Sequence, residues 1–110
     1  MRLRSNRDFK RVYKKGKRFW NHNFTIIVNK NFGLGTRIGF SVTTKYGNAV
    51  ERNRIKRQLR EILRKKYEQL DKNMDMIIIP KKNTKDMNYE QLKSSLNHLI
   101  RRSKKTKGRS

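Results

Sequence analysis

The sequence predicts an α+β sandwich in which helices pack on one small, mixed β-sheet of four strands. Two observations predict it: apolar residues recur at helical spacing in three segments, and short β-branched or aromatic runs lie between those segments. The expected order is α-β-β-α-β-α, with one more short strand at Arg18–Trp20. A chain of 110 residues has room for one compact domain, expected at residues 1–100.

The first helix is expected to begin at Ser5. Its hydroxyl can accept a hydrogen bond from the first turn, and Asp8, three residues later, can reach back toward the cap. Phe9 and Tyr13 are four residues apart and therefore share one face of this helix.

Three longer strands are expected after it. Residues 24–28 are β-branched or aromatic, and residues 37–43 alternate apolar with polar side chains; a turn at 29–35 would join the two as an antiparallel hairpin. The run Met76–Ile79 is apolar on both pleat faces, as expected for a strand covered on both sides. The segment between 43 and 76 has the length of a crossover, so strands 37–43 and 76–79 can lie parallel.

The longest helix is expected to begin after Asn48, with Glu51 placed to complete a capping box. Its apolar stripe and its polar face lie almost opposite each other at about 100° per residue. The stripe is Ile55, Leu59, Ile62, Leu63 and Tyr67, and the opposite face carries Asn53, Arg57, Arg60 and Arg64. A last helix, capped by Asn88, should end near Ile100, and residues 101–110 read as a basic, disordered tail.

Basic residues dominate the composition. Thirty-one Lys and Arg against eight Asp and Glu leave a formal charge of +23. Such a chain repels itself unless a polyanion neutralises it, so nucleic acid or an anionic surface is the expected partner. The sequence contains no cysteine, no secretory h-region and no apolar run near the ~18 residues of a membrane span. We therefore expect a cytoplasmic protein without a membrane partner.

Candidate catalytic groups are scarce. The two histidines, His22 and His98, fall in different elements, and the eight carboxylates are scattered along the chain. Hydrolysis of RNA requires a paired acid and base or clustered carboxylates that hold metal ions. We therefore expect no catalytic residue in the protein itself.

Two segments suggest binding to RNA. Arg52 and Arg54 stand at the start of the long helix, where a cation opposes the helix dipole, so phosphate contact explains them better than helix stability does. In segment 8–20, aromatic residues alternate with basic ones, a composition that suits stacking on single-stranded RNA. Phe9 and Tyr13 at i, i+4 are equally explained as core residues.

The segment 47–61, GNAVERNRIKRQLRE, resembles the protein subunit of bacterial ribonuclease P, whose conserved helix begins Gly-Asn-Ala-Val-x-Arg-Asn-x-x-Lys-Arg-x-x-Arg-Glu. The patterns Asp8-Phe9-x-x-Val12-Tyr13-x-x-Gly16, Gly39-Phe40-Ser41-Val42 and Tyr89-x-x-Leu92-x-x-Ser95-Leu96 resemble the same family in order and spacing. The resemblance covers nearly the whole chain. It departs from the family at Thr44, where a lysine is usual.

The resemblance implies a partner that composition alone does not name: a large catalytic RNA that removes the 5′ leader from precursor tRNA, with Mg²⁺ bound mainly by the RNA. The protein is then an accessory subunit of an endoribonuclease. The family also implies a left-handed crossover between the strands that flank the long helix, against the general rule.

Two sets of residues are accordingly expected to bind RNA. The set facing the catalytic RNA is Lys45, Asn48, Arg52, Asn53, Arg54, Lys56, Arg57, Arg60 and Arg64. The set lining a cleft for the substrate leader is Phe9, Arg11, Tyr13, Lys17, Phe19, Thr25 and Ile27. Two alternatives remain open: an RNA chaperone, ribosome-associated or general, without a ribozyme partner, and a ribonuclease that acts alone.

Overall fold

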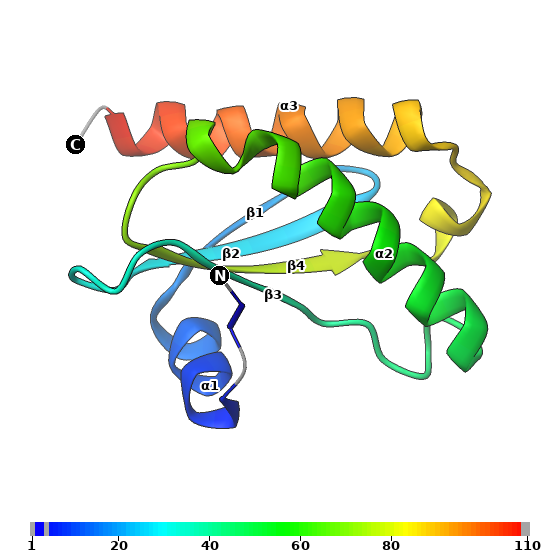
Figure 1. Cartoon of the computed structure of the whole chain (residues 1–110), viewed down its shortest axis with the longest axis horizontal. Helices are drawn as coiled ribbons and strands as arrows, with labels where there is room; N and C mark the ends of the chain where they lie inside the picture. Colours follow the sequence, from blue (N-terminus) through cyan, green and yellow to red (C-terminus); the bar gives the residue numbers. More distant parts are fainter. Residues whose placement is uncertain (1, 4, 109–110) are drawn as a thin grey trace.

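A computed structural model describes residues 2–3 and 5–108, and it arranges them in three layers around one mixed sheet. Figure 1 shows α1 below the sheet and the α2 and α3 helices above it. The helices are α1 (Asn6–Lys15), α2 (Ala49–Lys66) and α3 (Tyr89–Gly108), and the strands are β1 (Lys17–Trp20), β2 (Phe24–Lys30), β3 (Arg37–Phe40) and β4 (Met74–Pro80). Two 3-10 turns, η1 (Tyr67–Gln69) and η2 (Lys82–Asp86), flank β4 in sequence. The predicted α+β class and the short first strand are confirmed.

The strand order is β1-β2-β4-β3, which makes the predicted hairpin between β2 and β3 wrong. β2 pairs with β1 and β4, both antiparallel, and β3 pairs with β4 in parallel, as the crossover length predicted. The physical reason is that an apolar strand needs other elements packed on both of its faces. β4 is the strand that is apolar on both faces, so it takes an interior position in the sheet, where helices cover both sides.

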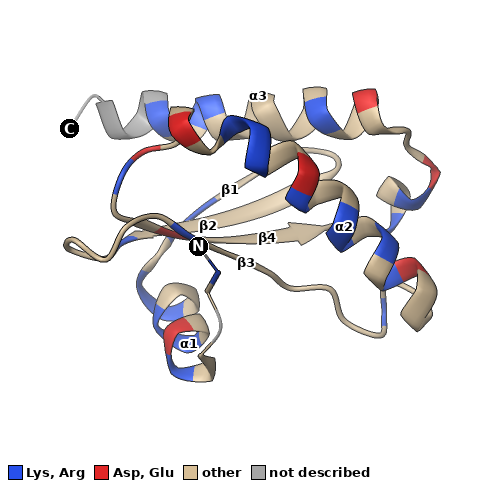
Figure 2. Cartoon of the chain, in the orientation of Figure 1, with Lys and Arg blue, Asp and Glu red and all other residues tan. Residues whose placement is uncertain are grey.

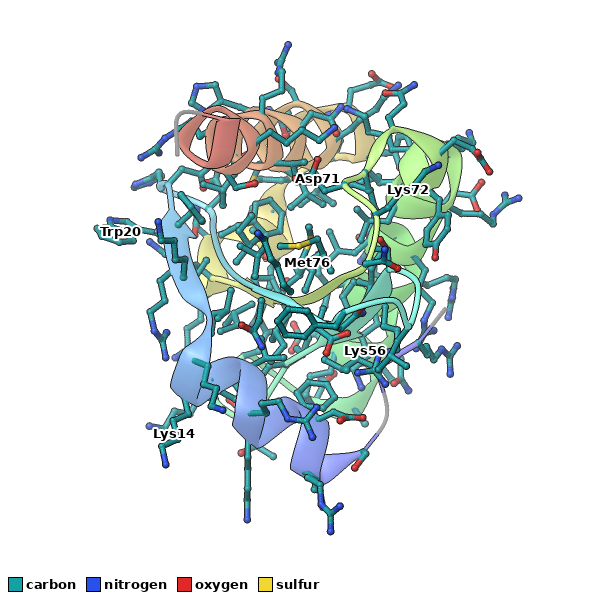
Figure 3. The ribbon with its side chains drawn as sticks, turned by 90° about the vertical axis from the view of Figure 1, so that its left-hand side faces the viewer. Lys14, Trp20, Lys56, Asp71, Lys72 and Met76 are labelled. Carbon is teal, nitrogen blue, oxygen red and sulfur yellow. The ribbon has the colours of Figure 1, made fainter. Side chains whose placement is uncertain are left out.

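The larger core lies between the sheet and the two upper helices. Side chains from β2 and β4, such as Ile26 and Ile78, meet Leu59 of α2 and Leu96 of α3, and all four are fully buried. Figure 3 shows the Met76 sulfur inside this layer. The predicted apolar stripe of α2 is confirmed at Ile55, Leu59, Ile62 and Leu63, which are buried, and at Tyr67, which packs against the same core.

A smaller core holds α1 against the opposite face. Val12, Ile27 and Ile77 are each 0% exposed there. Gly39 of β3 makes room for this packing, because a Cβ at that position would lie 2.4 Å from the Cζ of Phe9. The Phe9 ring therefore lies directly on the sheet, and any side chain at 39 would lift α1 away from it.

An ionic cluster that is buried at Asp75 and half-buried at Arg37 and Asp8 joins α1 to two strands. The Arg37 guanidinium donates to both carboxylate oxygens of Asp75 at 2.8 Å and to Asp8 of α1 at 3.2 Å. Asp75 is 1% exposed; burial by itself would raise the pKa of its carboxyl, but hydrogen bonds from Arg37 and Asn31 outweigh it and hold that pKa below its usual value. The predicted use of Asp8 as a returning cap residue is wrong, because the Ser5 cap accepts from Arg7 N while the Asp8 carboxylate turns to arginine.

The chain beyond residue 100 also differs from the predicted disordered tail. α3 continues through Gly108 because its packing continues: Ser103 is 4% exposed and donates to the Ile100 carbonyl, and the Arg102 guanidinium donates to the Trp20 carbonyl at 2.9 Å. Lys104 also donates to the Gln69 carbonyl. Residues 109–110 of the expected tail lie outside the described residues.

Candidate nucleic-acid interface

The start of α2 is built by a complete capping box. The Asn48 side chain accepts from Glu51 N at 2.8 Å, and the Glu51 carboxylate accepts from Asn48 N at 2.9 Å. The Asn48 N–H holds the pKa of Glu51 below its ordinary value. Asn48, expected among the RNA contacts, therefore already has a structural task, and its side-chain oxygen is occupied by the helix.

Basic residues recur along α2, with a few acidic residues among them (Figure 2). Asn53, Arg57, Arg60 and Arg64 are all exposed, as the helical spacing predicted, and Arg54 is exposed with them. Arg52, Lys56 and Arg60 follow one another at intervals of four and form a row along one flank of the helix; the first two are partly covered.

Most of these cations lack a carboxylate partner. Glu61 binds Arg64 at 2.7 Å and lies 3.8 Å from Lys65, and Glu51 lies 3.6 Å from Lys85. Among the described residues, six cations of the expected RNA-facing set form no ion pair: Lys45, Arg52, Arg54, Lys56, Arg57 and Arg60. This surface is therefore open to an external anion.

Crowding of positive charge extends to the junction of α2 with α3. Partial burial lowers the pKa of Lys66, and the neighbouring cations Arg101, Lys104 and Lys93 lower it further. A polyanion bound nearby would relieve this repulsion.

The face of the sheet on which α1 packs holds the second candidate surface. Residues directly opposite each other in the register share a face, which gives two rows across β1, β2 and β4. Arg18, Ile27 and Ile77 form one row, of which α1 covers the two isoleucines, and Trp20, Thr25 and Ile79 form the next row. This second row is only partly covered: Thr25 and Ile79 are half-buried and Trp20 is 59% exposed.

The open row leads to a groove beside β3. The groove has a volume of about 320 Å³, and the residues that line it include Ser41, Ile79 and three lysines, Lys45, Lys81 and Lys82. It therefore joins the sheet surface to the loop that precedes α2. The sheet surface predicted for the leader and the surface predicted for the catalytic RNA are therefore continuous through this groove.

The structure places the seven residues expected at the leader cleft on different surfaces. Phe9 and Tyr13 are half-buried on the α1 side of the sheet with Thr25, whereas Ile27 is fully buried beneath α1. The placement of Phe19 in the cleft is wrong, because its side chain belongs to the core on the other face.

Strand alternation separates the remaining members. Lys17 shares the face of Phe19, so the residues of β1 on the cleft side are Arg18 and Trp20. The Arg18 guanidinium lies 5.9 Å from the centre of the Tyr13 ring. Arg11 is exposed on α1 and lies 3.2 Å from Asp8. The signal that could have found Arg18 and Trp20 is the two-residue period, counted from the buried Phe19.

Groups able to perform hydrolysis do not gather on either surface. His22 and His98 are both exposed and lie on separate elements. Within the part of the chain that the structure describes, no three His, Asp or Glu side chains lie close enough together to hold a metal ion. In the same part, no helix has the length and apolar content needed to cross a membrane.

These features define a class of protein: a small, strongly basic α+β domain that presents unpaired guanidinium groups on one helix and, on its sheet, an exposed tryptophan beside a lysine-lined groove. Comparison with known proteins makes the class specific. A family model described as Ribonuclease P matches residues 1–104. The ribonuclease P protein component of Finegoldia magna is 58% identical over 107 residues, which cover 97% of this chain and 94% of that protein. The Bacillus cereus component is 41% identical over 103 residues, covering 93% and 90%.

Solved structures agree with the sequence relatives. A Staphylococcus aureus RNase P protein mutant superposes with a TM-score of 0.87 at 38% identity, covering 94% of this chain and 87% of that one. The Thermotoga maritima RNase P protein gives a TM-score of 0.85 at 33% identity, covering 93% and 96%. The chain belongs to the ribonuclease P protein family, the protein component of an endonuclease holoenzyme that processes tRNA.

Proposed function

We propose that this protein binds the catalytic RNA of ribonuclease P through α2 and guides the 5′ leader of precursor tRNA along the sheet face beside α1. It assists endonucleolytic removal of the leader, which gives the mature 5′ end of tRNA. The single observation that supports this most is the row of unpaired cations on a helix whose other face is buried in the core. Burial of that face fixes the helix backbone, so the arginines all project from one surface before RNA arrives.

The leader path follows from the open row of the sheet. Trp20, with Tyr13 at the edge of α1, offers ring faces on which successive bases can stack. Arg18 beside Tyr13 and the lysines of the adjoining groove supply charge for the backbone. Stacking accepts any base, so this path suits leaders of differing sequence.

The role of the protein in this proposal is positional and electrostatic. Mg²⁺ would supply charge stabilisation and water activation when it is bound by the RNA, and the described residues offer no carboxylate cluster to hold it. The side chains here orient the two RNAs and lower the cost of bringing their phosphates together.

Reconstitution tests the proposal. Precursor tRNA is incubated with the protein, with the cognate catalytic RNA, and with both, in limiting and in saturating Mg²⁺. Leader removal should be fastest with both components, and the gain should be largest where Mg²⁺ is limiting. If the protein leaves ribozyme cleavage unchanged but speeds annealing of unrelated RNAs, it is a chaperone; cleavage by the RNA-free protein alone would favour the stand-alone nuclease.

The leader path has its own test. Trp20→Ala removes an exposed ring and no core contact, and we expect it to weaken precursor tRNA more than mature tRNA, by about fivefold or more if one base stacks. Phe32→Ala is the matched control, because Phe32 is 90% exposed on the loop after β2, away from the row. Equal losses on both RNAs would reject the assignment. Trp20 is the sole tryptophan, so quenching of its fluorescence by a leader oligonucleotide reports contact directly.

A further inference from the structure

A further hollow lies at the flank of α2 and shares Arg60 and Arg64 with the RNA-facing set. It has a volume of about 690 Å³ and opens between the edge strand β3, the C-terminal half of α2 and the N-terminal segment at residue 2. Its apolar walls are Ile38, Phe40, Leu63 and Tyr67, and cationic side chains of Arg2 and Arg60 stand at its rim. The volume falls within the range of small-molecule sites, about 300–1,000 Å³.

The walls are held in place by contacts that do not involve a ligand. The Tyr67 hydroxyl donates to the Thr36 carbonyl at 2.6 Å, which fixes the ring beside β3. Phe40 ends β3 and packs its inner side on the larger core, so its outer side is left for the hollow. Leu3 N donates to the Ile38 carbonyl at 2.9 Å and holds the N-terminal segment along the edge of the sheet.

The two arginines that α2 contributes to the hollow differ in whether a carboxylate already binds them. Arg64 also lines the hollow, but Glu61 accepts from it at 2.7 and 2.9 Å. Arg60 forms no ion pair with any described residue, and its guanidinium lies 5.8 Å from the centre of the Phe40 ring. Arg60 therefore places a positive charge without a carboxylate partner beside the aromatic wall of the hollow.

We propose that this hollow is a binding site for one unstacked nucleotide of the partner RNA. The base lies against Phe40 and Tyr67, and the phosphate is bound by Arg60 and Arg2. Glu68 also lines the hollow, next to Tyr67, and its negative charge would repel a phosphate. The phosphate is therefore expected on the opposite side, where the arginines lie. The site deepens the proposed function, since an RNA bound along α2 would pass it, but binding of a nucleotide there can be measured without that RNA.

Charge decides between a nucleotide and a protein side chain as the occupant. A second copy of this chain carries the same +23 and would bring further cations to an arginine rim. An apolar peptide would leave Arg60 without an anion. A nucleotide satisfies both the aromatic wall and the cationic rim.

The test is a titration of the whole protein with AMP, followed by NMR in about 0.15 M salt, where long-range attraction is screened. Adenosine and inorganic phosphate serve as probes of each half of the ligand. Shifts should gather at β3, Tyr67 and the last turns of α2, and AMP should bind more tightly than either half alone. Shifts spread evenly over basic surfaces, or equal binding of phosphate and AMP, would overturn the proposal.

Two variants and one control sharpen it. Phe40→Leu keeps an apolar wall and should weaken AMP about fivefold by loss of stacking. Arg60→Gln should weaken AMP about tenfold by loss of a charge-assisted contact. Arg57→Gln removes the same charge from the outer face of α2 and should leave AMP binding unchanged.

The same three variants separate this site from the proposed function. If Arg57→Gln weakens binding of the catalytic RNA while Phe40→Leu alters neither AMP nor RNA binding, the pocket is refuted and the α2 surface stands. If AMP binds as described but no variant affects the catalytic RNA, the nucleotide site stands and the RNA assignment fails. Circular dichroism of Phe40→Leu checks that the sheet is retained.

Discussion

Salt should weaken binding of the catalytic RNA steeply, because the α2 surface binds phosphate by displacing counterions. The cations that determine the steepness are the six that form no ion pair among the described residues: Lys45, Arg52, Arg54, Lys56, Arg57 and Arg60. Arg64 is left out because Glu61 already neutralises it. Each neutralised phosphate contributes about 0.7–0.9 to the slope of log affinity against log salt.

Six contacts therefore give a slope of about −4 to −5. Raising monovalent salt from about 50 to about 200 mM should weaken binding by about 300-fold to about 2,000-fold. Arg57→Gln removes one contact from the exposed face, so the slope of this variant should be shallower by about 0.7–0.9, while its thermal unfolding stays within about 0.5 kcal/mol of the parent.

The assay is fluorescence anisotropy of labelled catalytic RNA at fixed Mg²⁺ over a series of monovalent salt concentrations. Lys14→Gln is the matched control, because this lysine projects outward from the end of α1 (Figure 3), on the opposite side of the sheet from α2. Its slope should equal that of the parent. A parent slope shallower than about −2, or equal loss of slope in both variants, would refute the assignment of phosphate contacts to α2.

Three further predictions concern stability. Asp75→Asn should cost about 1.5–3 kcal/mol in urea unfolding, because the half-buried Arg37 guanidinium loses its two shorter charge-assisted hydrogen bonds and keeps only Asp8 at 3.2 Å. The pKa of Asp75 is lowered in the folded state, so the parent keeps this stability above the unfolded value of about 3.9 and loses it as pH falls through the lower folded value. A variant with the same acid dependence as the parent would contradict this reasoning. Phe32→Asn should raise the free energy of unfolding by about 1 kcal/mol, because Phe32 is exposed at φ 57°, a conformation that asparagine tolerates better; a lower melting temperature would count against strain. Asn48→Ala should cost about 1 kcal/mol through loss of the cap, and Glu51→Gln, which can still accept from Asn48 N, should cost less; the reverse order in chemical denaturation would contradict the capping role.

Local features of the structure follow from the sequence because they depend on residues close together in the chain. The period of apolar residues located the buried stripe of α2, and the Asn48–Glu51 pair located its start. The arginines of the exposed face then followed from the helix geometry alone. The resemblance at residues 47–61 named the family, which a family model matching residues 1–104 confirms.

Features that join distant segments were decided by the tertiary structure. A two-residue period says which side chains of a strand share a face, but it does not say which strand lies beside it. The strand that can be buried on both faces takes an interior place, so β4 separates β2 from β3. Three further features depend on how the strands are arranged: the face of the sheet on which Phe19 lies, the pairing of Asp8 with Arg37, and the hollow beside Phe40.

The sequence by itself predicted the order of the helices and strands, the cationic face of α2 and the family. Only the tertiary structure decided strand order, the continuation of α3 past residue 100 and the continuity of the groove with the start of α2. The physical reason is that helix periodicity and capping are set by residues within one or two turns of each other. Strand pairing and pockets are instead set by competition among distant segments for the same buried surface.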